Sequence, residues 1–159
     1  MKIIFALFFI LSNVIKAQEV KVVGIADGDT FTALFADKHT ERIRLHGIDC
    51  PESGQPFGKA AKQFTSSLIF KKNVLLEKKD IDKYGRTIAI VKLSENMTLQ
   101  EELLKVGLAW HYTHYDNNQE WSRLENIAKT QQAGLWNDKN PIAPWEWRKQ
   151  NGMVNLFRN

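Results

Sequence analysis

The chain has 159 residues, which is enough for one domain with its own core and too few for two. Lys and Arg exceed Asp and Glu by only four, and Lys2 and Lys16 supply two of that excess, so net charge alone does not indicate a nucleic-acid partner. The single cysteine, Cys50, excludes an internal disulfide and a cysteine-based zinc site.

Residues 1–17 have the pattern of a secretory signal peptide. Lys2 gives a short positive start, an unbroken apolar run extends from Ile3 to Leu11, and Ala17 is a small residue suited to cleavage. The apolar run is shorter than the roughly 20 residues that a membrane span needs. We therefore expect an exported protein, secreted or periplasmic, with no stable membrane association after cleavage. A retained N-terminal anchor is the alternative interpretation.

Three strands are predicted next, at residues 19–26, 29–36 and about 40–47, because these segments are rich in Val, Ile, Thr and Phe. The first two meet at Asp27-Gly28-Asp29. Asp and Gly together favour a hairpin turn, whereas two neighbouring carboxylates would also suit a hard cation that prefers oxygen ligands. The tip alone leaves both interpretations open.

The rest of the chain alternates between helical and strand patterns. Apolar side chains recur at helical spacing after residue 56, and Thr98 and Glu101 have the spacing of a capping box before a short helix closed by Gly107. The expected elements are a helix over 57–68, strands at 73–79 and 86–93, a helix within 98–107 and a helix over 118–132.

This order of elements indicates an α+β fold, a five-stranded OB-like β-barrel with three helices. We divide the chain into the signal peptide at 1–17, one folded domain at 18–145 and a C-terminal tail at 146–159. The stretch before and into this tail, "NPIAPWEWRK" at 140–149, is rich in Pro and Trp. We expect it to pack on the body, with Trp145 and Trp147 as packing residues rather than a ligand cage.

Three acids and two arginines fall at loop or strand-end positions, namely Asp29, Asp49, Glu52, Arg44 and Arg86. Each position alone is typical of an ordinary polar turn or strand end. Together they have the composition of a phosphodiesterase site: carboxylates for a calcium ion, guanidinium groups for phosphate oxygens and a spare carboxylate to position a water.

Four motifs in order, "DGDT", "RLHGIDCPE", "DKYGR" and "GLAW", resemble the staphylococcal nuclease family over about residues 19–136. The resemblance implies an OB-like barrel and a calcium-dependent endonuclease that hydrolyses DNA and RNA with little sequence specificity and leaves 3′-phosphate ends. We expect a monomer that acts mainly on single-stranded or unpaired regions. A non-catalytic nucleic-acid-binding module of the same fold is the alternative.

The resemblance also implies roles for individual residues. It assigns the calcium carboxylates to Asp29 and Asp49, with the backbone carbonyl of Cys50 as a neutral ligand. It assigns phosphate binding to Arg44 and Arg86 and the general base to Glu52, so these three are the implied catalytic residues.

Nucleotide contacts outside the reacting group are implied for Lys83, Tyr84 and Tyr115. The chain departs from the family pattern at Cys50, where threonine is usual, and at Thr113, where a second aromatic ring is expected. Trp110 and Tyr112 could stack on a base in its place or could simply pack; the sequence leaves both open. A free cysteine in an exported protein is also expected to be open to oxidation.

Overall fold

The computed structural model describes residues 17–156, so the predicted signal peptide lies almost entirely outside the described residues. Strands β1 (Gln18–Ile25), β2 (Thr30–Leu34) and β3 (Thr40–Leu45) form an antiparallel meander. β5 (Asn73–Ile81) pairs with β1, and β6 (Thr87–Ser94) pairs with β5. Short β7 (Met97–Thr98) extends the sheet beyond β6.

The barrel closes through a parallel pairing between β3 and β6, in which Ile43 lies opposite Thr87 and Leu45 opposite Ala89. Inward-facing residues of these strands, including Phe31, Ile43 and Val91, are fully buried. A closed barrel leaves no free edge between its first and last strands. The predicted five-stranded OB-like barrel is thus confirmed.

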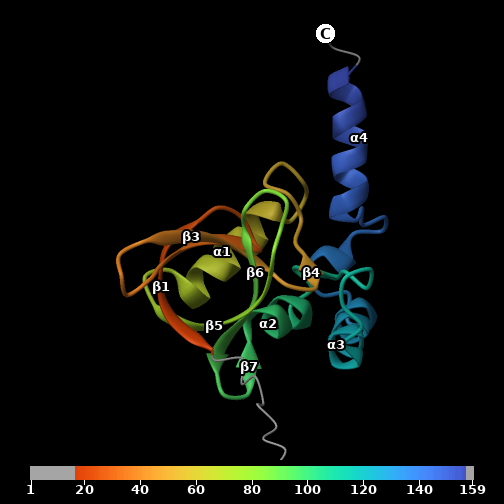
Figure 1. The fold of residues 1–159 in the computed structure, drawn as a ribbon. Coiled ribbons are helices and arrows are strands. Elements are labelled where there is room, and N and C mark those ends of the chain that lie inside the picture. The colour runs from red at the N-terminus through yellow and green to blue at the C-terminus, as the bar shows by residue number, and fades with distance from the viewer. Residues whose placement is uncertain (1–16, 157–159) are drawn as a thin grey trace, which may run out of the picture.

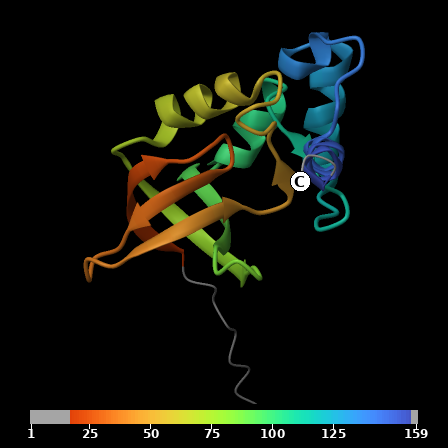
Figure 2. The same ribbon diagram turned by 90° about the horizontal axis from the view of Figure 1, so that it is seen from above.

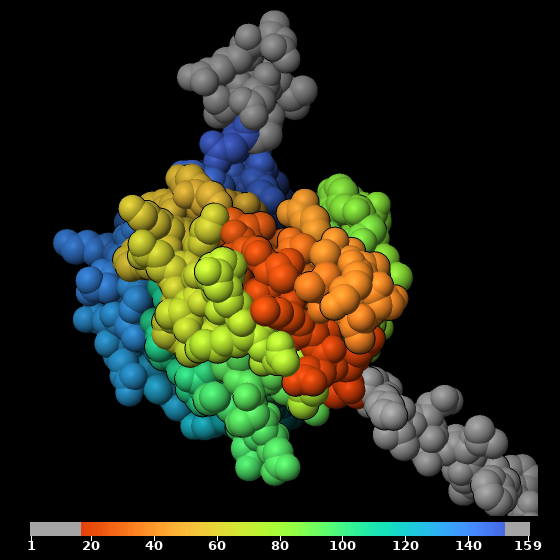
Figure 3. Space-filling view, turned by 90° about the vertical axis from the view of Figure 1, so that its left-hand side faces the viewer, coloured from red at the N-terminus to blue at the C-terminus, as the bar shows by residue number. Residues whose placement is uncertain are grey.

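Helix α1 (Gly58–Ile69) lies across one end of the barrel and buries Ala61, Thr65 and Ile69 (Figures 1 and 2). Seen from the side of β1, α1 and the first three strands form a continuous outer surface (Figure 3). Helix α2 (Leu99–Lys105) begins with the predicted capping box, because Thr98 Oγ1 accepts from the Glu101 N–H and the Glu101 carboxylate accepts from the Thr98 N–H.

A second small sheet holds the segment after β3. The third strand was predicted to reach residue 47, but β3 ends at Leu45 because Gly47 takes a positive φ of 67°. β4 (Ile48–Asp49) then pairs with β8 (Trp110–His111), and Asp49 lies opposite Trp110. This pairing ties Asp49 to the segment that leads into α3 (Gln119–Thr130) and the 3₁₀ turn η1 (Gly134–Asn137).

The prediction of three helices was wrong by one, because residues expected to form a tail form a fourth helix, α4 (Pro144–Leu156). Proline suits the first position of a helix, since its missing N–H would have no partner there. α4 starts beside β4 and extends away from the barrel (Figure 1). Within residues 17–156, no helix combines the length and apolarity needed to cross a bilayer.

Candidate active site

The Asp27-Gly28-Asp29 tip packs inward rather than projecting into solvent. Thr65 of α1 donates its hydroxyl to the Gly28 carbonyl over 2.5 Å, and a Cβ on Gly28 would lie 2.8 Å from the Cβ of Cys50. Only glycine permits this approach. The tip is therefore both a turn and a contact that brings Asp29 next to the segment after β4.

Asp29 and Asp49 meet at a single guanidinium group. Arg44 on β3 lies opposite Thr30 of β2, and its Nη2 binds Asp49 Oδ1 over 2.6 Å. Its Nη1 contacts Asp29 Oδ2 as an ion pair without hydrogen-bond geometry. Since one planar group spans both carboxylates, the sequence-distant acids converge as predicted.

Backbone and hydroxyl donors fix the orientation of Asp29. The Cys50 N–H donates to Asp29 Oδ2 over 2.6 Å, and the Thr30 hydroxyl donates to Oδ1 over 3.2 Å. Burial raises the pKa of Asp29 above its ordinary value, Arg44 acts against that rise, and nearby Asp27 adds to it. A further cation beside Asp29 would favour its ionised form.

Glu52 lies at the solvent side of the same cluster, with 37% of its side chain exposed. Two hydrogen bonds to Gln55 hold its backbone. The Gln55 side-chain Oε1 accepts from the Glu52 N–H over 3.1 Å, and the Gln55 backbone N–H donates to the Glu52 carbonyl over 2.8 Å. Glu52 can thus reach solvent while its main chain stays fixed, which suits a carboxylate that positions a water.

A third arginine, which the sequence analysis did not place in the site, approaches from α4. Arg148 Nη2 binds Asp49 Oδ2 over 2.8 Å, and Nη1 binds Glu52 Oε1 over 2.6 Å. The two carboxylates and the hydrogen bonds they accept raise the pKa of Arg148 in spite of partial desolvation, so it stays cationic. Proline at 144 was a usable signal for a helix there, but nothing in the sequence indicated that Arg148 would reach Asp49.

Arg86 is held within the turn between β5 and β6. Its Nε donates to Asp82 Oδ2 over 2.7 Å, and its backbone N–H donates to Asp82 Oδ1 over 2.9 Å. Among the described residues, no ion pair joins Arg86 to Asp29, Asp49 or Glu52. The structure therefore brings Arg44 to the carboxylates and leaves Arg86 on a neighbouring turn.

The residues expected to contact nucleotide are strongly exposed. Tyr84, at the β5–β6 turn, is 72% exposed and Tyr115 is 65% exposed. The Lys83 ammonium lies 5.1 Å from the centre of the Tyr84 ring. Tyr115 also meets Tyr112 edge to face at 4.9 Å. Exposed aromatic rings are the groups on which proteins commonly stack unpaired bases.

Tyr112 and Trp110 instead contact the start of α4. Tyr112 stacks on Trp145 with ring centres 4.7 Å apart and an angle of 8° between the planes. Trp110 meets Trp145 edge to face at 5.6 Å and also contacts Trp136. Of the two open interpretations, packing is what these contacts support for both residues, in agreement with the packing role predicted for Trp145.

The oxygen donors in this cluster fit a hard divalent cation. Asp29 and Asp49 supply two buried carboxylates, and calcium takes its remaining ligands from carbonyls and waters. Within residues 17–156, no group of three or more His, Cys, Asp or Glu side chains is arranged as a metal site. A bound ion would therefore use the carboxylate pair together with backbone oxygen, such as the Cys50 carbonyl, and water.

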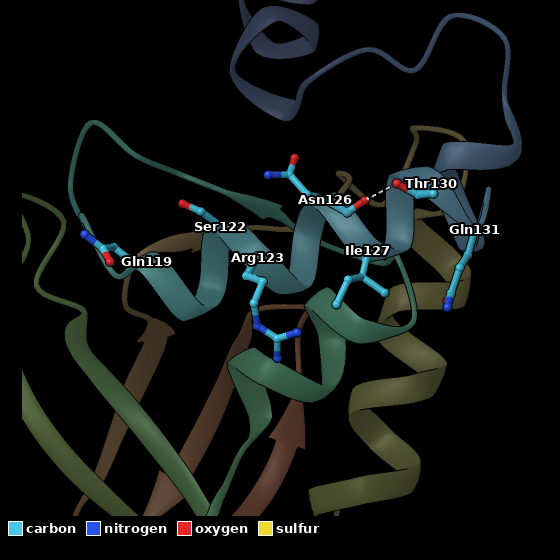
Figure 4. A pocket seen from close by; sticks show the side chains of 7 residues that line it. All are labelled: Gln119, Ser122, Arg123, Asn126, Ile127, Thr130 and Gln131. Carbon is cyan, nitrogen blue, oxygen red and sulfur yellow. Dashed lines mark hydrogen bonds between the residues drawn. The ribbon is translucent and has the colours of Figure 1, made fainter.

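A hollow elsewhere on the surface lacks this chemistry. It is lined by side chains of α3 and by Gln131, and Figure 4 shows Arg123 and Ile127 pointing from α3 to the same side. The Arg123 Nε–H donates to Glu120 Oε2 over 2.7 Å. No acid of the cluster lines the hollow, so the candidate site is at the carboxylates.

Comparison with known proteins points to one family. Residues 42–138 match the family model described as staphylococcal nuclease homologue. The chain is 38% identical over 137 residues to a Haemophilus influenzae protein named as an uncharacterized endonuclease, covering 86% of this chain and 76% of that protein. It is 36% identical over 139 residues to the micrococcal nuclease of Shigella flexneri, covering 81% and 79%.

A plant relative is similar over a shorter stretch. The chain is 43% identical over 108 residues to a staphylococcal-like nuclease of Arabidopsis thaliana, covering 68% of this chain and 33% of that protein. The family match begins at residue 42, so it includes Arg44, Asp49, Glu52 and Arg86 but not Asp29. The longer bacterial alignments cover most of the chain.

Proposed function

Because the chain belongs to the staphylococcal nuclease family and is an endonuclease that hydrolyses phosphodiester bonds, we propose that it is calcium-dependent. We further propose that it cleaves DNA and RNA with little sequence specificity, prefers single-stranded or unpaired regions, leaves 3′-phosphate ends and acts as a monomer. The observation that carries the proposal is the convergence of Asp29 and Asp49 on the Arg44 guanidinium.

Asp29, Asp49 and the Cys50 carbonyl would hold the calcium ion. When bound, the ion would supply positive charge next to the phosphate group that is attacked. Burial of both carboxylates supports this role, because charged oxygens removed from water are stable only when paired with cations.

The protein's own side chains would divide the remaining work. Arg44 offers planar N–H donors that match phosphate oxygens and can stabilise the charge that develops during attack. Glu52, on the solvent side, would orient the attacking water and accept its proton. Arg86 would bind the phosphate after releasing Asp82, and Lys83, Tyr84 and Tyr115 would contact flanking nucleotides.

Export is part of the proposal and rests on the sequence of residues 1–17. The described residues hold a single cysteine, which is buried, so folding does not depend on a disulfide. Cell fractionation, with mass spectrometry of the mature N-terminus, tests both export and cleavage near residue 17. An intact N-terminus in the membrane fraction would support the anchor interpretation instead.

The decisive experiment is digestion of single-stranded DNA and RNA by the purified protein with calcium and with excess chelator. We expect cleavage with calcium, loss of cleavage in chelator, and 3′-phosphate ends that block extension by a polymerase until a phosphatase removes them. Asp49→Asn should abolish the calcium response. Full cleavage in excess chelator would refute the calcium assignment, and polymerase-extendable products would refute the 3′-phosphate assignment.

A further inference from the structure

The start of α4 is fixed to the body at two points. Gln55 Nε2 donates to the Ile142 carbonyl over 2.6 Å, and Gln55 itself is buried. Two residues after Ala143, whose side chain is also buried, Trp145 stacks flat on Tyr112. The first turn of α4 is therefore held against both the loop that carries Glu52 and the segment that follows β8.

This anchored turn directs one cation into the acid cluster. Arg148 follows Trp145 by three residues and binds both Asp49 and Glu52. Its neighbour Lys149 is occupied within the helix, where it pairs with Glu146 over 2.9 Å. Among the described cations of α4, Arg148 is the one that contacts the site.

Arg44 and Arg148 approach Asp49 from different environments. Arg44 comes from the barrel wall, and only 13% of its side chain is exposed, whereas Arg148 is 45% exposed. Asp49 is almost wholly buried. The Arg148 guanidinium thus lies on the solvent-exposed side of the cluster, together with Glu52.

We propose that Arg148 is a third substrate-binding arginine of the nuclease, supplied in cis by the C-terminal helix, and that its guanidinium binds a backbone phosphate of the nucleic-acid strand. The proposal rests on the nuclease function above. Arg148 has a planar fork of donors suited to two phosphate oxygens, and it is already held at the mouth of the site. Asp49 and Glu52 keep that fork in place until a phosphate replaces them as its partner.

The test is direct binding of a single-stranded phosphorothioate oligonucleotide, which resists cleavage, measured by fluorescence anisotropy with calcium at several salt concentrations. Arg148→Ala should weaken binding about ten- to a hundredfold. It should also reduce the slope of log K against log salt by about 0.7, the value expected for one lost contact to a single strand. Lys149→Ala, the matched control on the same helix, should change neither quantity.

Arg148→Lys keeps the charge but not the planar fork, so we expect intermediate affinity with an unchanged salt slope. Circular dichroism of each variant establishes that it is folded. Unchanged or tighter binding by Arg148→Ala, with an unchanged salt slope, would overturn the proposal. Arg148 would then only pair with the carboxylates of Asp49 and Glu52. Cleavage by the wild-type protein in calcium tests the nuclease proposal separately, so failure of one proposal does not imply failure of the other.

Discussion

At the scale of single residues, Glu52 is the carboxylate whose position best suits proton transfer, because Asp29 and Asp49 are buried and Glu52 is not. We expect Glu52→Gln to lower kcat by about 10²- to 10⁴-fold, the range typical of a lost general base, with little change in oligonucleotide affinity. Steady-state kinetics on single-stranded DNA, together with anisotropy, separate the two effects. Glu146→Gln on α4 is the control, and an undiminished kcat in Glu52→Gln would remove Glu52 from the mechanism.

Cys50 behaves differently from what its sequence context suggested. The free thiol was expected to be open to oxidation, but it is 3% exposed and packed behind Gly28. Burial, reinforced by the negative charge of Asp29, raises the pKa of the thiol well above its ordinary value, and the thiolate is the reactive form.

We therefore expect the Cys50 thiol in folded protein to react with a disulfide reagent at pH 8 at least ten times more slowly than in denaturant, since the thiolate is scarce and shielded. Absorbance of the released thiol measures both rates. Cys50→Ser should abolish the signal and serves as the blank. Equal rates in the two states would show that the segment between β4 and α1 opens readily.

Only part of the site could be predicted from the kinds of residue in the sequence. The chemistry of carboxylates and guanidinium groups indicated Asp29, Asp49 and Arg44, and the structure brings these three together. The contact of Arg148 with Asp49 joins residues 99 positions apart, and no local pattern encodes such a distance. Likewise, the pairing of Arg86 with Asp82 depends on the conformation of a turn.

At the scale of elements, the Trp145–Tyr112 stack docks the first turn of α4, next to the ion pairs that Arg148 makes with Asp49 and Glu52. We expect Trp145→Ala to increase hydrogen exchange at residues 146–150 while exchange in β1–β3 is unchanged, because a stacked pair contributes roughly 0.5–1.5 kcal/mol beyond its buried area. Hydrogen-exchange mass spectrometry measures both regions. Trp147→Ala is the control, and unchanged exchange after Trp145→Ala would mean that other contacts dock the helix.

Elements with strong local signals were predicted well. The capping box of α2 and the helix over 118–132 are present, the latter as α3 with Asn118 as its cap. Helix α4 was not predicted because the stretch over 140–149, where it begins, is rich in Pro and Trp, although Pro144 suits a helix start. The third strand was predicted too long because the pairing of β4 with β8 joins segments about 60 residues apart, which local periodicity does not report.

At the scale of the whole molecule, the seam between β3 and β6 decides whether the sheet is a barrel. The Glu41 side chain of β3 links three strands at this seam. Its carboxylate accepts from the Thr87 hydroxyl of β6 over 2.5 Å and from the Lys78 ammonium of β5 over 2.9 Å. Burial opposes ionisation of Glu41, but the hydrogen bonds from Thr87, His39 and Lys78 outweigh it and lower its pKa to about 2. The ionised carboxylate therefore helps to hold three strands together.

A pKa lower in the folded than in the unfolded chain stabilises the fold above the unfolded value of 4.5, and this contribution is lost as the pH falls through about 2. We expect Glu41→Gln to reduce the free energy of unfolding at pH 7 by about 1 kcal/mol, after allowing for solvent screening of a partly exposed group. The difference from wild type should shrink between pH 4.5 and 2, as urea unfolding followed by tryptophan fluorescence can measure. Glu102→Gln, which removes a surface pair with Lys105 on α2, should show no comparable loss. A Glu41→Gln difference that stayed constant down to pH 2 would mean that the seam depends on the shape of the side chain rather than on its charge.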